Sequence, residues 1–448
     1  MASAKIEGTL KPVANGHGGV HVAHHKNLAK TPVEVIATPA SVVLPMSMHI
    51  GAPCDPVVKR GDTVKVGQLV GDSDKFVSAP IYASVSGKVT KVGPVRVAQG
   101  RTVNAVTIES DGLMEEADYT APEVNSKEDF LKAVRASGLV GLGGAGFPTH
   151  VKLNLKPDAK VDTLIVNIAE CEPYITVNHR ECLEHTDDIF DGLENIKKWI
   201  PFEHIYIAIE DNKADAAKVL LKSMDKKPEW KDLAQIVILK SSYPQGAEKV
   251  MIEAVTGRQV PPGKLPADVG CVVMNVESVT TLARFLRTGR PLVSRNLTCD
   301  GSAVADPKNL CVPIGTSVQY VIDYGGGFKK DPYKVFMGGP MMGIALDSLD
   351  VPIVKNNNAI IAFADGAMKV KKTRACIRCG RCVSVCPMSL EPTKIERMAH
   401  LGKADELQKA GAMVCMECGS CAYACPSGRP LVQYMRLAKT IVREASAK

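Results

Sequence analysis

Two stretches near the carboxyl end of the chain, CIRCGRCVSVCP at residues 376–387 and CMECGSCAYACP at residues 415–426, share one spacing of cysteines. Each follows the pattern Cys-x2-Cys-x2-Cys-x3-Cys-Pro, with which bacterial ferredoxins hold [4Fe–4S] clusters. A zinc site is the alternative, but four ligands on one ion do not require a regular triplet followed by proline. The two runs therefore predict two clusters in a helical, ferredoxin-like module.

Each run supplies three closely spaced thiolates, and in paired ferredoxin runs the fourth cysteine ligates the other cluster. This rule predicts two crossed ligand sets: Cys376, Cys379, Cys382 and Cys425 for cluster 1, and Cys415, Cys418, Cys421 and Cys386 for cluster 2. Because such clusters accept and donate single electrons, we expect the module to conduct electrons between two redox partners. The cysteine spacing leaves open what lies at either end.

The remaining composition agrees with metal binding by the cysteines. The chain has 14 cysteines, and those outside the two runs are scattered, whereas a disulfide framework is typical of short secreted chains. Residues 366–448 carry 15 Lys and Arg against 6 Asp and Glu. Nucleic-acid binding is the weaker explanation of this basic tail, because positive charge offsets anionic clusters and can attract an acidic redox partner.

The sequence does not predict a membrane-spanning or secretory segment. No apolar run approaches the roughly 18 residues of a membrane helix, and the first residues lack the apolar centre of a signal peptide. Aromatic residues make up only 5%, and 37 Gly with 28 Pro favour short strands and many turns over a large helical bundle. We expect a cytoplasmic protein, with docking on a membrane partner left open.

A β-barrel is predicted at residues 31–112, which are rich in Val, Ile and Thr and punctuated by Gly, Pro and Asp. The stretch 59–89 resembles the barrel of biotinyl and lipoyl carrier domains. Lys75 is a conceivable attachment point for a prosthetic group, but a structural barrel is the expectation. The preceding segment, 1–30, contains four histidines for which a metal site is the less favoured interpretation: His17, His21, His24 and His25.

The rest of the chain predicts an α/β multidomain protein. Residues 113–290 alternate helix and strand, which is typical of a largely parallel sheet. Helices are expected at 126–138, near 178–199, near 213–224, at 247–257 and at 278–289, and strands at 162–170, 204–210, 235–242 and 271–277. Residues 291–370 return to short strands, as in a small β-grasp-like, soluble ligand-binding domain, and residues 371–448 form the cluster module.

The loop GLGGAG at residues 141–146 contains a GxGxxG pattern. A dinucleotide fingerprint should follow a strand and open a helix, whereas this loop follows a predicted helix, so the pattern alone is weak and a structural turn is the alternative. Glycines nevertheless let backbone N–H groups close on a phosphate, and Lys152 lies just downstream. The loop is therefore a candidate phosphate cradle.

The glycine loop belongs to a series of segments that resembles a known family. GLGGAGFPTHVK (141–152) resembles the flavin and NADH loop of the 51-kDa-type NADH-binding subunit of respiratory complex I. NIAECEP (167–173) is similar to that family's NADEGEP, and YPQGAEK (243–249) and MNVESVTTLA (274–283) resemble its later flavin-contacting segments. The resemblance implies an FMN- and NADH-binding domain at 113–290.

The amino-terminal elements narrow the resemblance. GGVH (18–21), HIGAP (49–53) and the order of barrel, flavin domain, β-grasp-like domain and ferredoxin module resemble the C subunit of the Rnf ion-translocating ferredoxin:NAD oxidoreductase complex. This resemblance covers nearly the whole chain. It implies a peripheral subunit on the cytoplasmic face of the membrane, with non-covalent FMN, NAD(H) and two [4Fe–4S] clusters. The implied partners are other subunits of the complex, especially its iron–sulfur subunit.

The resemblance also implies roles for individual residues. The FMN and nucleotide phosphates are expected at Gly141, Gly143, Gly144, Gly146 and Lys152. Phe147 is expected to stack on the adenine, and Glu172 to face the nucleotide. FMN contacts are expected at Asn167 and Glu170, and the flavin wall is completed by Tyr243, Gly246, Glu248 and Asn275. The chain differs from complex I at Leu142, Ala169 and Ala247, where that family has Arg, Asp and Glu.

Together these expectations predict an NAD-dependent flavin and iron–sulfur oxidoreductase. NADH delivers two electrons while clusters accept one each, so a flavin is the natural converter, and no side chain needs to act as acid or base. One alternative is a soluble flavin and iron–sulfur reductase of the cobalamin-reductase kind, against which the amino-terminal barrel argues. The other is a non-enzymatic wiring subunit, which flavin content would exclude.

Overall fold

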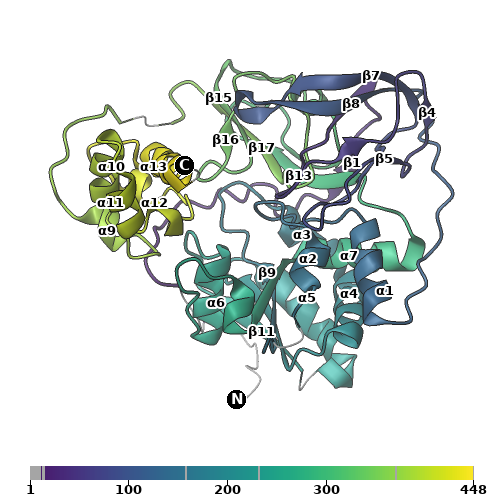
Figure 1. The fold of residues 1–448 in the computed structure, drawn as a ribbon, viewed down its shortest axis with the longest axis horizontal. Helices are drawn as coiled ribbons and strands as arrows, with labels where there is room; N and C mark the ends of the chain where they lie inside the picture. The colour runs from purple at the N-terminus through teal and green to yellow at the C-terminus, as the bar shows by residue number, and fades with distance from the viewer. Residues whose placement is uncertain (1–11, 13–15, 157–158, 231–232, 369–370, 447–448) are drawn as a thin grey trace.

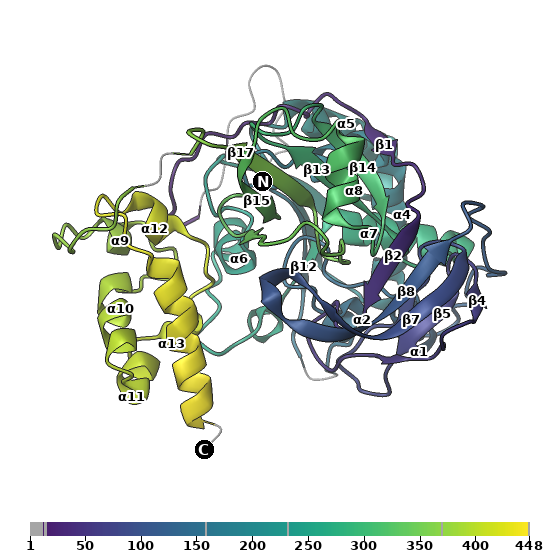
Figure 2. The same ribbon diagram turned by 90° about the horizontal axis from the view of Figure 1, so that it is seen from above.

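The computed structural model describes residue 12 and residues 16–156, 159–230, 233–368 and 371–446. The chain forms a barrel unit, a parallel α/β unit, a mixed-sheet unit and a helical cysteine unit (Figure 1). The cysteine unit stands to one side of the other three, and the view from above shows the same separation (Figure 2). The predicted α/β multidomain architecture is confirmed, while the domain boundaries stay predictions and part of segment 1–30 lies outside the described residues.

The barrel unit is built from short antiparallel strands. One sheet has the order β2 (Ser41–Pro45), β8 (Thr102–Ser110), β7 (Gly87–Arg96) and β4 (Thr63–Val64), and the other joins β3 (Asp55–Pro56), β5 (Leu69–Asp72) and β6 (Ile81–Tyr82). Buried residues alternate along the strands, as in Val42 and Leu44 of β2, because successive side chains point to opposite faces. Lys75 lies exposed in the bend between β5 and β6.

The first expected strand of the barrel is placed differently. β1 (Val33–Val35) pairs in parallel with β14 (Lys308–Pro313) at the edge of the mixed sheet. Val35 is 75% exposed, so this edge strand buries little apolar surface where it lies. The amide of Asn309 donates to the carbonyls of Leu28 and Thr31 and holds the preceding segment against β14. The prediction that this strand belongs to the barrel is therefore wrong, and the start of the barrel domain stays a prediction.

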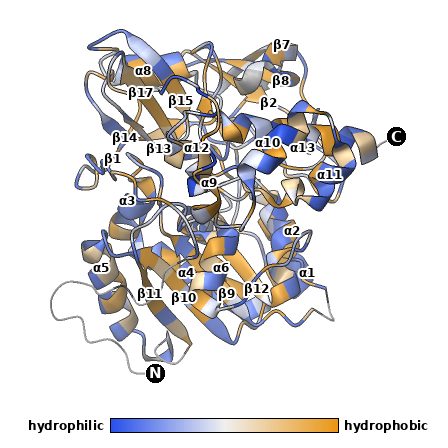
Figure 3. Ribbon diagram, turned by 90° about the vertical axis from the view of Figure 1, so that its left-hand side faces the viewer, coloured by the Kyte–Doolittle hydropathy of each residue, from blue (hydrophilic) through white to orange (hydrophobic). Residues whose placement is uncertain are grey.

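The α/β unit contains a four-stranded parallel sheet of order β11 (Ala234–Leu239), β10 (His204–Glu210), β9 (Thr163–Ile168) and β12 (Cys271–Asn275). Figure 3 shows these hydrophobic strands among helices whose outer faces are hydrophilic. The helices of this unit are α1 (Lys127–Ala136), α2 (Thr149–Leu153), α3 (Val177–Glu184), α4 (Thr186–Trp199), α5 (Ala214–Asp225), α6 (Glu248–Thr256) and α7 (Val276–Thr288).

The helix expected near 178–199 is two helices. The backbone of His185 leaves the helical region, with φ −133° and ψ 37°, and separates α3 from α4. Asp187 and Asp188 then occupy the first turn of α4, where negative charge favours the start of a helix. The single-helix prediction is wrong because an amphipathic pattern continues across a break of one residue.

The mixed-sheet unit has the strand order β1, β14, β13 (Ser294–Asp300), β17 (Ala359–Ala364), β15 (Pro332–Met337) and β16 (Ile344–Ala345), with α8 (Val318–Tyr324). The cysteine unit contains α9 (Arg381–Ser384), α10 (Pro392–His400), α11 (Ala404–Lys409), α12 (Ser420–Ala424) and α13 (Leu431–Ser446). Its small core includes Ile395, Leu407 and Met435. In the described ranges, no helix is both long and apolar enough to cross a membrane.

Candidate functional site

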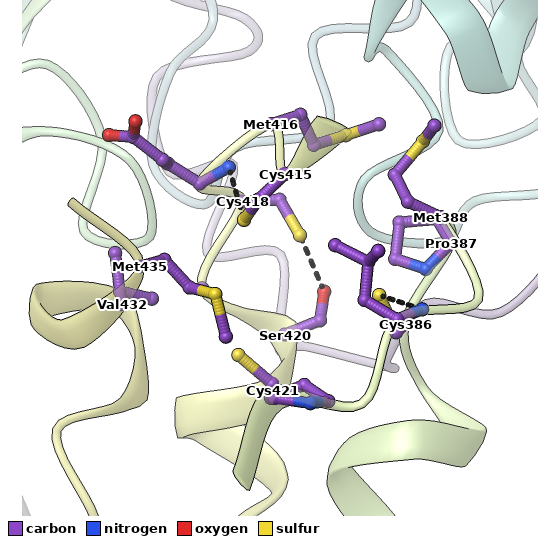
Figure 4. Close-up of a pocket in the computed structure, with 14 residues that line it drawn as sticks. Cys386, Pro387, Met388, Cys415, Met416, Cys418, Ser420, Cys421, Val432 and Met435 are labelled. Carbon is purple, nitrogen blue, oxygen red and sulfur yellow. Dashed lines mark hydrogen bonds between the residues drawn. The ribbon is translucent and has the colours of Figure 1, made fainter. Parts of the chain in front are cut away.

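Two cavities in the cysteine unit bring together the cysteines that were assigned to each cluster. One cavity is lined by Cys415, Cys418 and Cys421 with Cys386 of the other run (Figure 4). The second is lined by Cys376, Cys379 and Cys382 with Cys425. In each cavity three cysteines of one run thus meet the fourth cysteine of the other run. This is the crossed arrangement that the sequence predicts.

The two cysteine loops have the same backbone design. Arg378 and Glu417, which precede the second cysteine of each run, have positive φ angles of 54° and 60°. This left-handed turn aims their N–H groups at the sulfur two residues earlier, with N–Sγ distances of 3.4 Å to Cys376 and 3.3 Å to Cys415. Amide donors to sulfur favour the thiolate form and tune a bound cluster.

The cavities fit a cubane cluster better than a single ion. All 14 cysteines lie in the described residues, and none of them forms a disulfide there. Across the same residues, no three His, Cys, Asp or Glu side chains converge closely enough to hold one metal ion. Four thiols placed around a larger space suit a cluster whose iron atoms each take one cysteine. We therefore assign these eight cysteines as the proposed cluster ligands.

The two cavities differ in exposure. Cys376 and Cys379 of cluster 1 are exposed, as is the whole run 371–381 that contains them, with several Lys and Arg residues. At cluster 2, Cys386 and Cys418 are buried, and Cys415 and Cys421 are half-buried. The cavity predicted for cluster 1 therefore opens at a basic surface, and the cavity predicted for cluster 2 has no cysteine that is fully exposed.

The candidate flavin site lies where the strand order of the parallel sheet reverses. The chain runs from β9 outward to β10 and β11, and β12 then returns to the other side of β9. Ligands bind at such switch points beyond the carboxyl ends of the strands. Asn167 is the last residue but one of β9, Asn275 is the last residue of β12, and the two pair with each other in the sheet register. A Cβ on Gly143 would lie 2.5 Å from the amide nitrogen of Asn275, so the glycine loop crosses this point.

A chain of polar contacts fixes the floor of the site. The Asn275 amide donates to the side-chain oxygen of Asn178 at 2.8 Å, and the N–H of Asn178 donates to Glu170 at 2.6 Å. The second carboxylate oxygen of Glu170 is buried and has no hydrogen-bond partner among the described residues. A buried acceptor without a partner is costly unless a ligand donates to it, so Glu170 fits a group with N–H donors.

Lys152 and Asn167 are held by neighbours within the site. The Lys152 ammonium contacts Glu248 at 2.8 Å and the Val273 carbonyl at 2.9 Å. The Asn167 amide donates to the carbonyl of Gly246 at 2.9 Å. The structure thus brings the predicted residues of the glycine loop, 167–170, 246–248 and 275 to one end of the sheet. They fit a flavin phosphate and ring through backbone N–H groups, one ammonium and several amides.

Two further predicted residues lie at the junction with the cysteine unit. The carboxylate of Glu172 accepts the N–H groups of Met341 and Met342 at 3.1 and 2.7 Å, and burial raises the pKa of Glu172 to about 7. The Tyr243 hydroxyl donates to the carbonyl of Cys418 at 2.6 Å. Tyr243 therefore joins the flavin end of the sheet to a cysteine of cluster 2.

An amino-terminal strap, residues 16–26, completes this junction, and the sequence alone did not single out its contacts. The N–H of Val20 donates to the carbonyl of Tyr243 at 2.7 Å, and the N–H of Gly19 donates to Val385 at 2.9 Å. The Lys26 ammonium contacts the carbonyls of Glu170, Glu172 and Ile175 at 2.6 to 2.9 Å. Burial lowers the pKa of Lys26 to about 8. The GGVH segment indicated the family, but it did not indicate which residues the strap contacts.

Three of the four histidines of the strap pack against aromatic rings, and His17 is exposed. His25 stacks on Tyr174 with ring centroids 4.8 Å apart, and His21 meets the edge of His24 at 5.8 Å. The thiol of Cys171 accepts the N–H of Gly246 at 3.3 Å, and burial raises its pKa. The ring contacts of His21, His24 and His25 are thus packing contacts, and the buried Cys171 thiol is held mainly in its neutral form.

These features define a multidomain flavin and iron–sulfur electron-transfer protein. Four family matches agree with this class: the RnfC barrel sandwich hybrid domain at residues 14–113, the Nuo51 FMN-binding domain at 134–284, the SLBB domain at 298–345 and the 4Fe–4S dicluster domain at 368–426. The chain belongs to the family of C subunits of Rnf-type, ion-translocating oxidoreductase complexes.

Three relatives support this assignment. The chain is 44% identical to the C subunit of the Na(+)-translocating ferredoxin:NAD(+) oxidoreductase complex of Acetobacterium woodii, across 94% of this chain and 96% of the relative. It is 44% identical to the proton-translocating counterpart of Clostridium ljungdahlii, across 96% and 94%. It is 38% identical to the C subunit of the ion-translocating oxidoreductase complex of Rhodobacter capsulatus, across 96% and 84%.

Proposed function

We propose that this chain transfers electrons between NAD(H), FMN and two [4Fe–4S] clusters, as a peripheral subunit of a membrane-bound, ion-translocating ferredoxin:NAD oxidoreductase. The observation that carries the proposal is the Tyr243 junction, where the flavin end of the parallel sheet meets a cluster 2 cysteine. The names of the relatives support the NAD and ferredoxin reaction and the membrane complex. Its other subunits, especially an iron–sulfur subunit on the cytoplasmic face, are the proposed partners.

The residues of this chain bind and orient the cofactors. A bound FMN supplies the conversion between two-electron hydride chemistry and single-electron transfer. The N–H groups of the glycine loop and the Lys152 ammonium would hold phosphate, while Asn167, Glu170 and Asn275 would hold the ring. Since no proton transfer by a side chain is required, no residue receives an acid or base role.

The contacts support an order for the two clusters. A Cβ on Gly18 would lie 3.0 Å from the backbone of Cys386, and Tyr243 contacts Cys418, so the body of the protein meets cluster 2 ligands. Cluster 1 lies at the exposed basic run 371–381. We therefore place cluster 2 next to FMN and cluster 1 next to the partner subunit. The basic surface suits an acidic partner.

Two observations bear on the alternatives. A soluble reductase of the cobalamin-reductase kind is disfavoured by the amino-terminal barrel match and by relatives that are named as members of a complex over almost their full length. A wiring subunit without flavin is disfavoured by the buried oxygen of Glu170 at the switch point, which has no partner among the described residues. Flavin content separates the second alternative from the proposal.

The purified protein is expected to release about one non-covalent FMN per chain on denaturation. The glycine loop, Asn167 and Asn275 provide the binding site for it. The measurement is fluorescence and mass analysis of the supernatant, before and after reconstitution with FMN. Finding no flavin in either sample contradicts the proposed function.

Replacing Phe147 by Ala should weaken NADH binding, because the ring offers a stacking surface to the adenine. The expected loss is about 1 kcal/mol, or roughly fivefold in Kd. Phe147 is half-buried beside the exposed stretch 143–145, so its removal should leave the FMN content almost unchanged. An NADH titration with unaltered affinity would remove Phe147 from the site.

A further inference from the structure

The exposed stretch of the glycine loop, residues 143–145, has apolar neighbours that come from a different domain. Ile50 and Phe76 of the barrel unit are 46% and 59% exposed, and both belong to segments that contact the glycine loop or the helix after it. Single exposed apolar residues are ordinary on protein surfaces. Two beside a candidate phosphate cradle suggest a binding role.

Direct contacts fix the position of both residues. The N–H of Ile50 donates at 3.0 Å to the carbonyl of Gly146, the residue that precedes Phe147. The carbonyl of Phe76 lies 3.1 Å from Nε2 of His150, and the two rings meet edge to face at 6.0 Å. His150 lies in the first turn of α2, three residues after Phe147, which precedes the helix. Both barrel residues therefore lie near the proposed adenine-stacking residue.

The two barrel segments are also joined to each other and anchored to the α/β unit. The N–H of Ala52 donates to the carbonyl of Val77 at 2.9 Å and connects the Ile50 and Phe76 segments. The Arg135 guanidinium of α1 contacts Asp72 at 2.6 Å and the carbonyl of Ser73 at 2.7 Å, at the base of the Phe76 bend. The bend is thus held in place before any ligand binds, which lowers the entropic cost of binding.

From these contacts we propose that Ile50 and Phe76 form a wall of the adenine pocket, so that the barrel completes the dinucleotide site begun by the glycine loop and Phe147. The proposal rests on the proposed function, since it concerns the same dinucleotide. Adenine has a flat, apolar face that aromatic and aliphatic side chains can cover. In carrier domains the corresponding bend of the barrel bears a covalently attached prosthetic group. Here the bend that contains the exposed Lys75 would instead contact a nucleotide that binds and dissociates.

The test compares NADH with reduced nicotinamide mononucleotide, which lacks the adenosine part. Kd values for both are measured on the full-length protein, loaded with FMN and clusters, for Phe76→Ala and Ile50→Ala. Leu113→Ala is the matched control, because Leu113 is an exposed apolar residue that follows the last barrel strand. FMN content and the unfolding temperature of each variant report its folding.

The expected result is an NADH Kd raised about fivefold in Phe76→Ala and about twofold in Ile50→Ala, with the mononucleotide Kd unchanged. Leu113→Ala should match the unaltered protein for both ligands. Unchanged NADH affinity in both barrel variants overturns the proposal, as does an equal loss for NADH and the mononucleotide. If the unaltered protein binds neither ligand, the proposed function itself fails, which is a distinguishable outcome. Weaker binding of a partner subunit with normal NADH affinity would make this surface a protein contact and also overturns the proposal.

Discussion

Replacement of Cys386 by Ser is expected to abolish the cluster held by Cys415, Cys418 and Cys421, although Cys386 belongs to the other run. The reason is the cavity of Figure 4, in which Cys386 faces those three cysteines. The cluster of Cys376, Cys379 and Cys382 should keep its ligands, because its fourth is Cys425. Electron transfer from NADH to the partner should stop, since the lost cluster is the one that we propose to lie next to the flavin.

The measurement is EPR and Mössbauer spectroscopy of Cys386→Ser beside Cys415→Ser and Cys376→Ser. The crossed assignment is supported if Cys386→Ser loses the same spectroscopic signal as Cys415→Ser. If it instead loses the signal lost in Cys376→Ser, each run ligates its own cluster and the crossed assignment is wrong. Iron content and the reciprocal variant Cys425→Ser distinguish the loss of one cluster from unfolding of the whole unit, because an empty metal site can destabilise a small fold.

Gly144→Ala should bind FMN at least tenfold more weakly while folding normally, a change of about 1.4 kcal/mol. A Cβ at position 144 would meet no described atom of the chain within 4 Å. Any loss must then come from a ligand that approaches the backbone closely, as phosphate does in a glycine cradle. Flavin retention during gel filtration and an FMN titration of the stripped protein are the measurements.

The control is Gly325→Ala, in the mixed-sheet unit. Its Cβ would meet backbone oxygens at 3.3 Å, so the substitution tests what an added methyl group does to stability away from the site. Gly144→Ala should unfold at nearly the temperature of the unaltered protein. Gly325→Ala should unfold at a lower temperature, because its methyl group crowds two backbone oxygens, but should keep its FMN affinity. Normal FMN affinity in Gly144→Ala would mean that the loop is only a structural turn, the alternative that its sequence context left open.

The sequence predicted best what short spacing determines. The crossed cysteine sets follow from residues three or four apart, and the helix at α1 follows from Ser126 and the acidic residues after it. Asn167 and Asn275 could be predicted as neighbours in one site only through the family resemblance. The strand order that pairs them does not follow from the residue pattern of either strand.

Contacts between residues far apart in the chain could not be predicted from the sequence. Lysine is a residue type that usually lies at the surface, yet the ammonium of Lys26 is enclosed by three carbonyls of the segment 170–175. Asn178 lies inside a predicted helix, and nothing in that pattern shows that it bridges Glu170 and Asn275. β1 was assigned to the wrong sheet for the same reason, since its partner β14 lies far along the chain.

The strap also affects the order in which contacts can form while the chain is being synthesised. Its Gly19 and Val20 leave the ribosome early, but their partners Tyr243 and Val385 emerge much later. At roughly 5–20 residues per second, the strap waits for tens of seconds without its partners. We therefore expect the barrel and flavin domains to fold during translation and the Val20 part of the strap to pair with Tyr243 first. The contact of Gly19 with Val385 can form only after the first cysteine run has emerged.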